Sequence, residues 1–368
     1  MLELEGKFNK AKIFADSVDN VSISQVINLL NQPFVKGQKI RLMPDIHPGA
    51  SCTIGMTMTI EDKVVPDLVG ADIGCGMDVV YLDADEVDLK RLDEVIHKKV
   101  PSGYSINEVP HRFMKNINLT DLHCYFNLEY GSQGNFALGS LGGGNHFIEL
   151  EKTSNNDLIL IVHSGSRRMG KEVCEYYQKQ AWKEFKRKYH TSYQSDFIYC
   201  EGPLFEKYIH DMKIMQEYAI LNRKAIIDTI LTNMGLDYTD SFTTVHNFVD
   251  LDKMILRKGA VSALKGEKLI IPINMAQGSL ICEGKGNSDW NYSAPHGAGR
   301  LLSRLQAKSS ITIDEFKKSM EGIYSSSISE NTLSESPMAY KPIDTILNNI
   351  KDTVKVLDIA KPVYNFKS

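Results

Sequence analysis

The sequence lacks any apolar run long enough to cross a membrane, since no window approaches the roughly 18 apolar residues that such a helix needs. Its first residues, MLELEGKFNKAKIF, contain no uninterrupted apolar stretch and no small-residue cleavage site. This composition argues against a secretory signal peptide. We therefore expect a cytoplasmic protein with no membrane association.

Paired cysteines are also missing. Six cysteines are scattered over the 368 residues, and none belongs to a Cys-x-x-Cys pair. This spacing excludes a zinc ribbon and a thioredoxin-type dithiol. Disulfides are not expected in a cytoplasm, so a cysteine with a special role must be recognised by its neighbours.

An excess of positive charge is absent as well. The chain has 42 Lys and Arg against 46 Asp and Glu, a net charge of −4, which argues against a protein that coats nucleic acid by charge alone. Two short basic clusters, 183–188 and 223–224, are best interpreted as solvated helix faces. Hydrophobic residues make up 42% of the chain, a proportion typical of globular proteins.

The pattern of apolar residues predicts a mixture of helices and strands. Helical spacing covers 172–194 and 203–234, with Pro203 suited to a first helical turn and Gly235 suited to a helix end. Buried strands are predicted at 79–82, 158–162 and 268–272. Strands and helices do not alternate cleanly and no linker or repeat is visible. We therefore expect an α+β or irregular α/β fold.

Asp72 and Cys75 are the first candidates for metal ligands. They lie three residues apart between glycines, so a tight turn would aim both side chains the same way. A carboxylate and a thiolate suit a divalent transition metal, and a thiolate can bridge two ions. Considered alone, the pair is more simply explained by a buried small side chain and a turn or helix-cap residue.

Three histidines extend this candidate set. His146, His163 and His246 each follow an apolar or glycine-rich stretch and precede a loop-like one. Each alone is more often a core histidine than a ligand. Joined to Asp72 and Cys75, they would form a binuclear site suited to manganese, iron, cobalt or zinc. Five other histidines lack such a context and are expected to be structural or exposed: His97, His111, His123, His190 and His210.

His296 lies in a different setting, Pro-His-Gly-Ala-Gly-Arg, which ends at Arg300. A histidine in such a loop can act as a covalent nucleophile on a phosphoryl group. Arg300 could bind phosphate oxygens bidentately, and the glycines could offer backbone N–H groups. A plain glycine-rich turn with a solvent-facing histidine explains the loop equally well. The loop 284–287 contains glycine and lysine but is not a Walker motif.

Ser164, Ser166 and Arg167 form a second candidate anion site. They follow a predicted strand and precede a helix expected to start near Gly170 or Lys171, and helix N-termini attract phosphate. Capping of that helix by Ser166 is compatible with the same pattern.

Taken together and in this order, the motifs closely resemble the RtcB family of RNA ligases. The resemblance runs from Met43 to the C-terminus. It is carried by Asp-Ile-Gly-Cys-Gly-Met, Gly-Asn-His-Phe-x-Glu, His-Ser-Gly-Ser-Arg, Arg-Lys-Gly-Ala and His-Gly-Ala-Gly-Arg. Each motif is short, but their joint occurrence is specific and outweighs the simpler explanations of the single segments.

The resemblance implies a role for each matching residue. Asp72, Cys75 and His146 would hold one Mn²⁺, and Cys75, His163 and His246 a second, with the thiolate bridging. His296 would accept GMP, Asn145 would contact phosphate and Glu149 would read the guanine edge. Further contacts to the guanylate would come from Ser279, Gly297, Ala298, Gly299, Tyr340 and Lys367. Arg167 and Arg300 would bind phosphates or RNA ends, and Asp45 and His47 would have supporting roles.

The resemblance also implies the reaction and the fold. A family member uses GTP and two Mn²⁺ ions to join an RNA 3′-phosphate, or the 2′,3′-cyclic phosphate that precedes it, to a 5′-hydroxyl through a histidine–GMP intermediate. It acts in RNA repair or transfer RNA splicing, often with an archease-type activator. The implied architecture is α+β, with residues 1–368 in a single domain around a central metal-containing pocket.

Several loops depart from the family pattern. The departures are Ala50-Ser-Cys52, Pro272-Ile-Asn-Met-Ala276, Arg168 and Pro295. They suggest a divergent, shorter RNA-repair paralogue. The alternative to a ligase is a two-metal phosphodiesterase or cyclic-phosphate hydrolase that does not use GTP, and the intact His296 loop argues against it.

Overall fold

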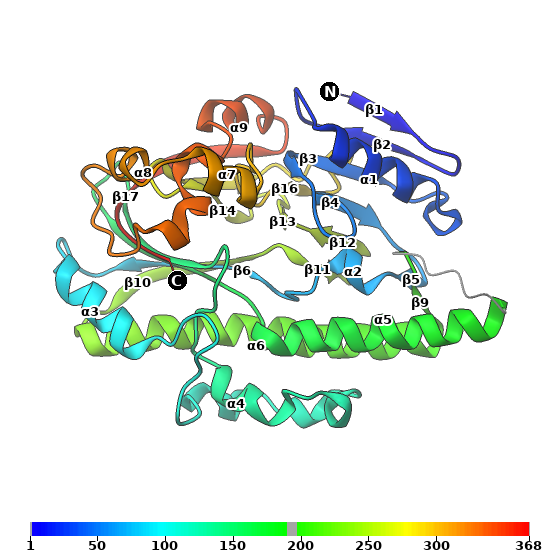
Figure 1. The fold of residues 1–368 in the computed structure, drawn as a ribbon, viewed down its shortest axis with the longest axis horizontal. Helices are drawn as coiled ribbons and strands as arrows, with labels where there is room; N and C mark the ends of the chain where they lie inside the picture. The colour runs from blue at the N-terminus through cyan, green and yellow to red at the C-terminus, as the bar shows by residue number, and fades with distance from the viewer. Residues whose placement is uncertain (1, 190–196, 368) are drawn as a thin grey trace.

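The structure is a computed structural model that describes residues 2–189 and 197–367. Two β-sheets lie above a pair of long helices, and shorter helices cover the opposite side (Figure 1). The mixture of helices and strands confirms the α+β expectation. Among the described residues, no helix is long and apolar enough to cross a membrane.

The larger sheet has seven strands, and all neighbouring strands in it are antiparallel. Their order across the sheet is β10 (Tyr238–Val245), β6 (Gly76–Leu82), β8 (Leu158–Ser164), β7 (Phe147–Lys152), β17 (Val354–Lys367), β15 (Gly278–Gly284) and β14 (Lys268–Asn274). The three predicted strands correspond to β6, β8 and β14, so those predictions are confirmed.

The apolar run of β8 is continuous because both faces of the sheet are covered. Leu160 and Val162 pack with Ile226 and other residues of a long helix on one face. Ile159 and Ile161 point to the other face and share a cluster with residues of β14 and β15. The sheet therefore curls so that its far strands pack back onto its centre.

The smaller sheet has six strands, and four of them come from the N-terminal part of the sequence (Figure 1). Their order is β1 (Leu2–Glu5), β2 (Lys10–Ile13), β3 (Ile40–His47), β4 (Ile54–Thr59), β12 (Ile255–Lys258) and β11 (Asn247–Asp250). Two short strand pairs are also present among the described residues: β13 (Ala260–Ser262) with β16 (Ser293–Pro295), and β5 (Lys63–Val64) with β9 (Cys200–Glu201).

Helices α5 (Arg167–Tyr189) and α6 (Pro203–Met234) are the two longest and lie side by side (Figure 1). Pro203 occupies the first turn of α6, and Gly235 ends it in a left-handed conformation, as predicted. Helix α5 begins five residues before the predicted 172, and its predicted end at 194 falls outside the described residues. The basic cluster 183–188 is exposed on α5, as expected, apart from the half-buried Phe185.

The remaining helices are shorter. They are α1 (Asn20–Leu30), α2 (Pro66–Val69), α3 (Leu89–Lys99), α4 (Gly134–Ala137), α7 (Arg304–Ser310), α8 (Ile313–Ser319) and α9 (Ile343–Asn349). Helices α7, α8 and α9 lie on the side of the molecule opposite α5 and α6 (Figure 1). Two 3₁₀-helices, η7 (Glu330–Glu335) and η8 (Pro337–Ala339), connect α8 to α9.

Candidate functional site

The predicted metal ligands gather at one end of the larger sheet. His246 follows β10, Cys75 precedes β6, His163 lies at the end of β8 and His146 precedes β7. Because β10, β6, β8 and β7 are adjacent and antiparallel, the end of one strand lies beside the start of the next. The register aligns Gly76 with Ser164 and Phe147 with His163, so pairing alone brings these ligands together.

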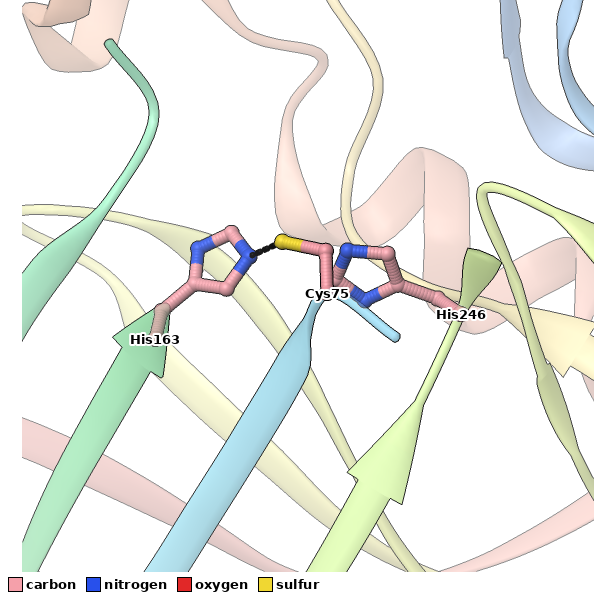
Figure 2. Close-up of side chains that lie close together, drawn as sticks. All are labelled: Cys75, His163 and His246. Atoms are coloured by element: carbon pink, nitrogen blue, oxygen red, sulfur yellow. Dashed lines mark hydrogen bonds between the residues drawn. The ribbon is translucent and has the colours of Figure 1, made fainter. Parts of the chain in front are cut away.

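The side chains form two overlapping groups that could hold a metal ion. One group is Cys75, His163 and His246, and the other is Asp72, Cys75 and His146. Within each group the ligand atoms lie within 4.8 Å of one another. Figure 2 shows the Cys75 thiol between the two imidazoles of the first group, 3.3 Å from His163 Nε2. Cys75 is therefore the member that both groups share.

Two of the imidazoles are oriented by backbone carbonyls. His163 Nδ1 lies 3.1 Å from the carbonyl of Asn145, and His146 Nδ1 lies 2.8 Å from that of Leu141. Since a carbonyl only accepts, both Nδ1 atoms carry hydrogen, and the Nε2 atoms of both rings face Cys75. Nδ1 of the third imidazole, His246, is buried without a hydrogen-bond partner, as expected for a group completed by a cation.

The electrostatics of the cluster also suit a cation. Burial, with the neighbouring histidines, lowers the pKa of His163 and His246 well below the usual value, so both are neutral as metal ligands must be. Burial and the Asp72 carboxylate raise the pKa of the Cys75 thiol, and a bound cation would reverse that shift. Burial opposes ionisation of Asp72, but the hydrogen bond and charge of His146 outweigh it and lower the Asp72 pKa.

His296 lies beside this cluster, with its ring centroid 4.8 Å from that of His246. Asp45 on β3 holds it from the other side: Asp45 Oδ2 lies 2.7 Å from His296 Nδ1 and also accepts the His296 backbone N–H at 3.1 Å. Since a carboxylate only accepts, Nδ1 carries the hydrogen and Nε2 is left with its lone pair. Asp45 therefore orients the imidazole directly, a larger role than the supporting one expected from sequence.

Two glycines make these contacts possible. A Cβ on Gly299, which has φ +74°, would lie 2.4 Å from the carbonyl oxygen of Asp45. A Cβ on Gly165 would lie 2.1 Å from the carboxylate of Asp72. A side chain at Gly299 would displace the backbone of Asp45, and one at Gly165 would displace the carboxylate of Asp72.

A cavity of about 980 Å³ opens beside His296; we call it the His296 cavity. The predicted residues that line it are Asn145, Glu149, His163, His296, Gly297, Ala298, Gly299, Arg300, Tyr340 and Lys367. Lys367 reaches the cavity because β17 pairs with β7. This pairing places Lys367 opposite Phe147, at the same end of the sheet as the metal ligands. His47 also lines the cavity, and burial lowers its pKa to about 4, so it is neutral.

Glu149 projects into the His296 cavity from β7, and a hydrogen bond from Asn365 on β17 fixes it. Burial raises the Glu149 pKa to about 7, against the opposing charge of Lys367. Ser279 does not line the cavity, contrary to expectation for a guanylate contact. It is fully buried behind the wall, where its hydroxyl donates to Glu151 at 2.9 Å.

A second cavity, also about 980 Å³, lies on the other side of the metal cluster; we call it the Arg167 cavity. Asp72 and His146 line it together with Arg167 and Arg168. Of the predicted anion site, only Arg167 faces a cavity, since Ser166 donates to Asp72 from its backbone and hydroxyl. The hydroxyl of Ser164 donates to the carbonyl of Leu141.

The expectation for Arg223 was wrong. Rather than lying on a solvated helix face, its guanidinium is fully buried, with Nε 2.8 Å from Asp78 Oδ1. It also donates to the carbonyls of Gly74 and Ser164. Arg223 thus ties down the residue before Cys75 and the residue after His163, and it supports the site from within the core.

The loop 284–287 lines neither cavity and instead bonds through its backbone to Ala263 and Thr353. Of the five histidines expected to be structural or exposed, four line neither cavity, and His190 lies outside the described residues. His123, His210 and Asp211 form a further group of metal-type side chains. Both Asp211 oxygens are already occupied by backbone N–H groups, His210 and the hydroxyl of Tyr177, so this group is a structural clamp.

Comparison with known proteins identifies the family. The family model described as "tRNA-splicing ligase RtcB" matches residues 25–130 and 125–368. RNA-splicing ligase RtcB of Escherichia coli strain K12 is 30% identical over 377 residues, covering 92% of each chain. The chain belongs to the RtcB family. A tRNA-splicing ligase RtcB of Methanococcus maripaludis is 24% identical, covering 98% of this chain and 94% of that protein.

Membership in the RtcB family confirms the resemblance drawn from the motifs. Sequence reasoning nevertheless missed several residues that line the His296 cavity, among them Arg304 and Glu335. Glu335 belongs to no motif used in the resemblance, and nothing in its local sequence distinguishes it from a surface acid. Its importance follows from its neighbours in space, which come from distant parts of the chain.

Proposed function

We propose that the protein is a GTP- and Mn²⁺-dependent RNA ligase that joins 2′,3′-cyclic phosphate or 3′-phosphate RNA ends to 5′-hydroxyl ends. One observation carries this proposal. His296 is oriented by Asp45, lies beside the metal-type cluster and lines a cavity of about 980 Å³. A metal-dependent hydrolase needs the cluster but has no use for an oriented nucleophile beside it.

The residues present fit two metal ions that share Cys75. Asp72, Cys75 and His146 would hold one ion, and Cys75, His163 and His246 the other. The neutral imidazoles, the oriented Nε2 atoms and the unpartnered His246 Nδ1 support this assignment. Bound Mn²⁺ would neutralise charge that develops on phosphate oxygens during the reaction.

In the first step, Nε2 of His296 attacks the α-phosphate of GTP. An N–P bond forms, the bond to the bridging oxygen breaks, and pyrophosphate leaves. Nδ1 keeps its hydrogen, so the imidazole gains positive charge as the phosphoramidate forms. The Asp45 carboxylate, 2.7 Å from Nδ1, stabilises that charge.

The base and phosphates of GTP would occupy the His296 cavity. Glu149 as a carboxylate accepts hydrogen bonds from the guanine edge, which adenine cannot supply in the same pattern. Tyr340 and Lys367 line the same wall and complete the guanylate contacts. Asn145 and the backbone of Gly297, Ala298 and Gly299 lie close enough to His296 to contact the phosphate. We do not assign Ser279 a direct contact, since it lies behind the wall.

In the second and third steps the GMP passes to RNA. The 3′-phosphate of one RNA end attacks the His296 phosphoramidate, forming a diphosphate link to GMP. The 5′-hydroxyl of the other end then attacks the RNA phosphate, a 3′–5′ phosphodiester forms and GMP leaves. Arg300, which lines the His296 cavity, and Arg167, which lines the Arg167 cavity, would bind the phosphates of the two RNA ends.

The site also supports the proposal of a single domain. Asp45 comes from the smaller sheet, the metal-type ligands come from the larger one, and Lys367 comes from the C-terminus. All three parts are needed to assemble one site. An archease-type activator and a cytoplasmic location are proposed on the family resemblance alone, as is a role in RNA repair or transfer RNA splicing.

A guanylylation assay tests the proposed function. The purified protein is incubated with Mn²⁺ and α-labelled GTP, and protein-bound label is tested for acid lability and alkali stability. Label on the wild type but not on His296→Ala would support the phosphoramidate. A protein that takes no label but hydrolyses 2′,3′-cyclic phosphates without GTP would be a two-metal phosphodiesterase, and the ligase proposal would be wrong.

A further inference from the structure

The carboxylate of Glu335 lies in the wall of the His296 cavity, at the end of η7. Only 3% of the residue is exposed. A buried carboxylate needs partners because its desolvation is costly. Four donors supply them, and they come from three segments of the chain other than η7.

Each oxygen of Glu335 has two of these partners. Oε2 accepts from Lys367 Nζ at 2.8 Å and from the Tyr340 hydroxyl at 2.7 Å. Oε1 accepts from Arg300 Nη1 at 3.4 Å and from Arg304. All four donors line the His296 cavity themselves, so Glu335 connects most of the positively charged wall.

The charges in this group are unequal. Three cations surround one carboxylate, which leaves a net positive wall suited to a polyphosphate. Burial would raise the Glu335 pKa, but the charges of Lys367 and Arg304 and the hydrogen bonds from Lys367 and Tyr340 lower it to about 2. Glu335 is therefore ionised at neutral pH.

The geometry fixes side chains that would otherwise move. Lys367 is the second-last residue, and its backbone is bound on both sides by Ser327. Its ammonium lies 5.5 Å from the centroid of the Phe147 ring and donates a hydrogen bond to Glu335. The Arg300 guanidinium likewise lies over the Tyr340 ring, 4.9 Å from its centroid. Long side chains lose considerable rotamer freedom when ordered, and a shared carboxylate orders them before a ligand arrives.

We infer that Glu335 is a positioning residue for nucleotide binding: it holds Lys367 and Tyr340 in place for the guanylyl donor and keeps Arg300 and Arg304 directed along the same wall. This inference rests on the proposed function, because it takes GTP as the occupant of the His296 cavity. Preorganised donors bind a ligand more tightly because the cost of ordering them has already been met.

The inference is tested by measuring GTP affinity of the full-length, Mn²⁺-loaded protein by titration calorimetry. Glu335→Gln should weaken GTP binding by about tenfold or more, since hydrogen bonds to charged groups are lost. Glu330→Gln is the matched control, an exposed acid at the start of the same 3₁₀-helix. It should bind GTP as the wild type does.

A double-mutant cycle separates positioning from general stabilisation. If Glu335 acts through Lys367, adding Glu335→Gln to Lys367→Met should weaken GTP binding far less than Glu335→Gln does alone. The kinetic counterpart is a raised KM for GTP with guanylylation at saturating GTP largely retained. If circular dichroism shows that Glu335→Gln does not fold, Glu335→Asp replaces it in the cycle. Aspartate keeps the negative charge, but its shorter side chain withdraws the carboxylate from its four donors.

The outcomes are distinct. If the wild type binds GTP and Glu335→Gln binds it equally tightly, this inference is wrong and the proposed function still stands. Fully additive losses in the cycle would also overturn it, because Glu335 would then act independently of Lys367. A wild type that binds no GTP would overturn both the proposed function and the role of Glu335.

Discussion

The substitution Asp45→Asn measures how much one negative charge contributes to the rate at which His296 is guanylylated. In the wild type the Asp45 carboxylate is completely buried and lies 2.7 Å from His296 Nδ1. Asparagine has nearly the same shape and its amide oxygen can still accept from Nδ1. The substitution therefore removes the negative charge while leaving the ring close to its original place.

The magnitude follows from the change in hydrogen-bond type. Bonds that involve a charged group contribute about 1.5–3 kcal/mol, against about 1 kcal/mol for neutral ones. The His296 imidazole becomes positive only as the N–P bond forms, so most of the loss falls on the transition state. The difference of about 0.5–2 kcal/mol should lower the guanylylation rate at saturating GTP about twofold to thirtyfold, with the KM for GTP little changed.

The assay is single-turnover labelling of the protein with α-labelled GTP, with bound Mn²⁺ measured on the same samples. Asp88→Asn is the matched control, because Asp88 lines neither cavity and caps α3 by accepting from the Arg91 backbone N–H. It loses the same charge, and asparagine is an equally good cap, so its labelling rate should match the wild type. An Asp45→Asn protein that labels at the wild-type rate would refute the orienting role, and so would a loss confined to KM.

Three other perturbations test separate parts of the site. Cys75→Ala should reduce bound Mn²⁺ to background by metal analysis, because both groups of ligands share that thiol; Cys200→Ala, another buried cysteine, should retain its metal. GTP affinity should rise between about pH 6 and about pH 8 in the wild type, since Glu149 has a pKa of about 7 and its ionised form is the stronger acceptor for the guanine N–H groups. Glu149→Gln should show no such rise, and an equal rise there would assign the titration to another group. Arg223→Met should lower the free energy of unfolding in urea by about 3–5 kcal/mol, because Asp78 would stay buried without its partner; a change below about 1 kcal/mol would mean that the pair contributes little.

The sequence by itself determined the family and the chemical identity of the site. Asp72, Cys75 and the three histidines were selected by motif and glycine context, and the structure places all five in two overlapping groups. The long helices and strands could also be predicted from the sequence. The apolar run of β8 and the helical spacing of α6, with Pro203 and Gly235 at its ends, depend on local patterns that the chain carries within a few residues.

Only the tertiary structure decided which distant residues meet. The strand order β10-β6-β8-β7-β17 brings Lys367 to the same sheet edge as the metal-type ligands, and no local pattern encodes that order. Burial was also invisible in the sequence. Arg223 looked like a surface residue and proved to be a core cation, whereas Ser279 proved to lie behind the wall that it was expected to form.

Asp45 and Glu335 show the physical reason most clearly. Each is a carboxylate whose role depends on a partner far along the chain: Asp45 bonds to His296, and Glu335 bonds to Lys367. A residue's type fixes what it can donate or accept, and the sequence shows this directly. Whether a carboxylate is solvated, caps a helix or orients a nucleophile depends on long-range packing and strand register, which are properties of the folded chain as a whole.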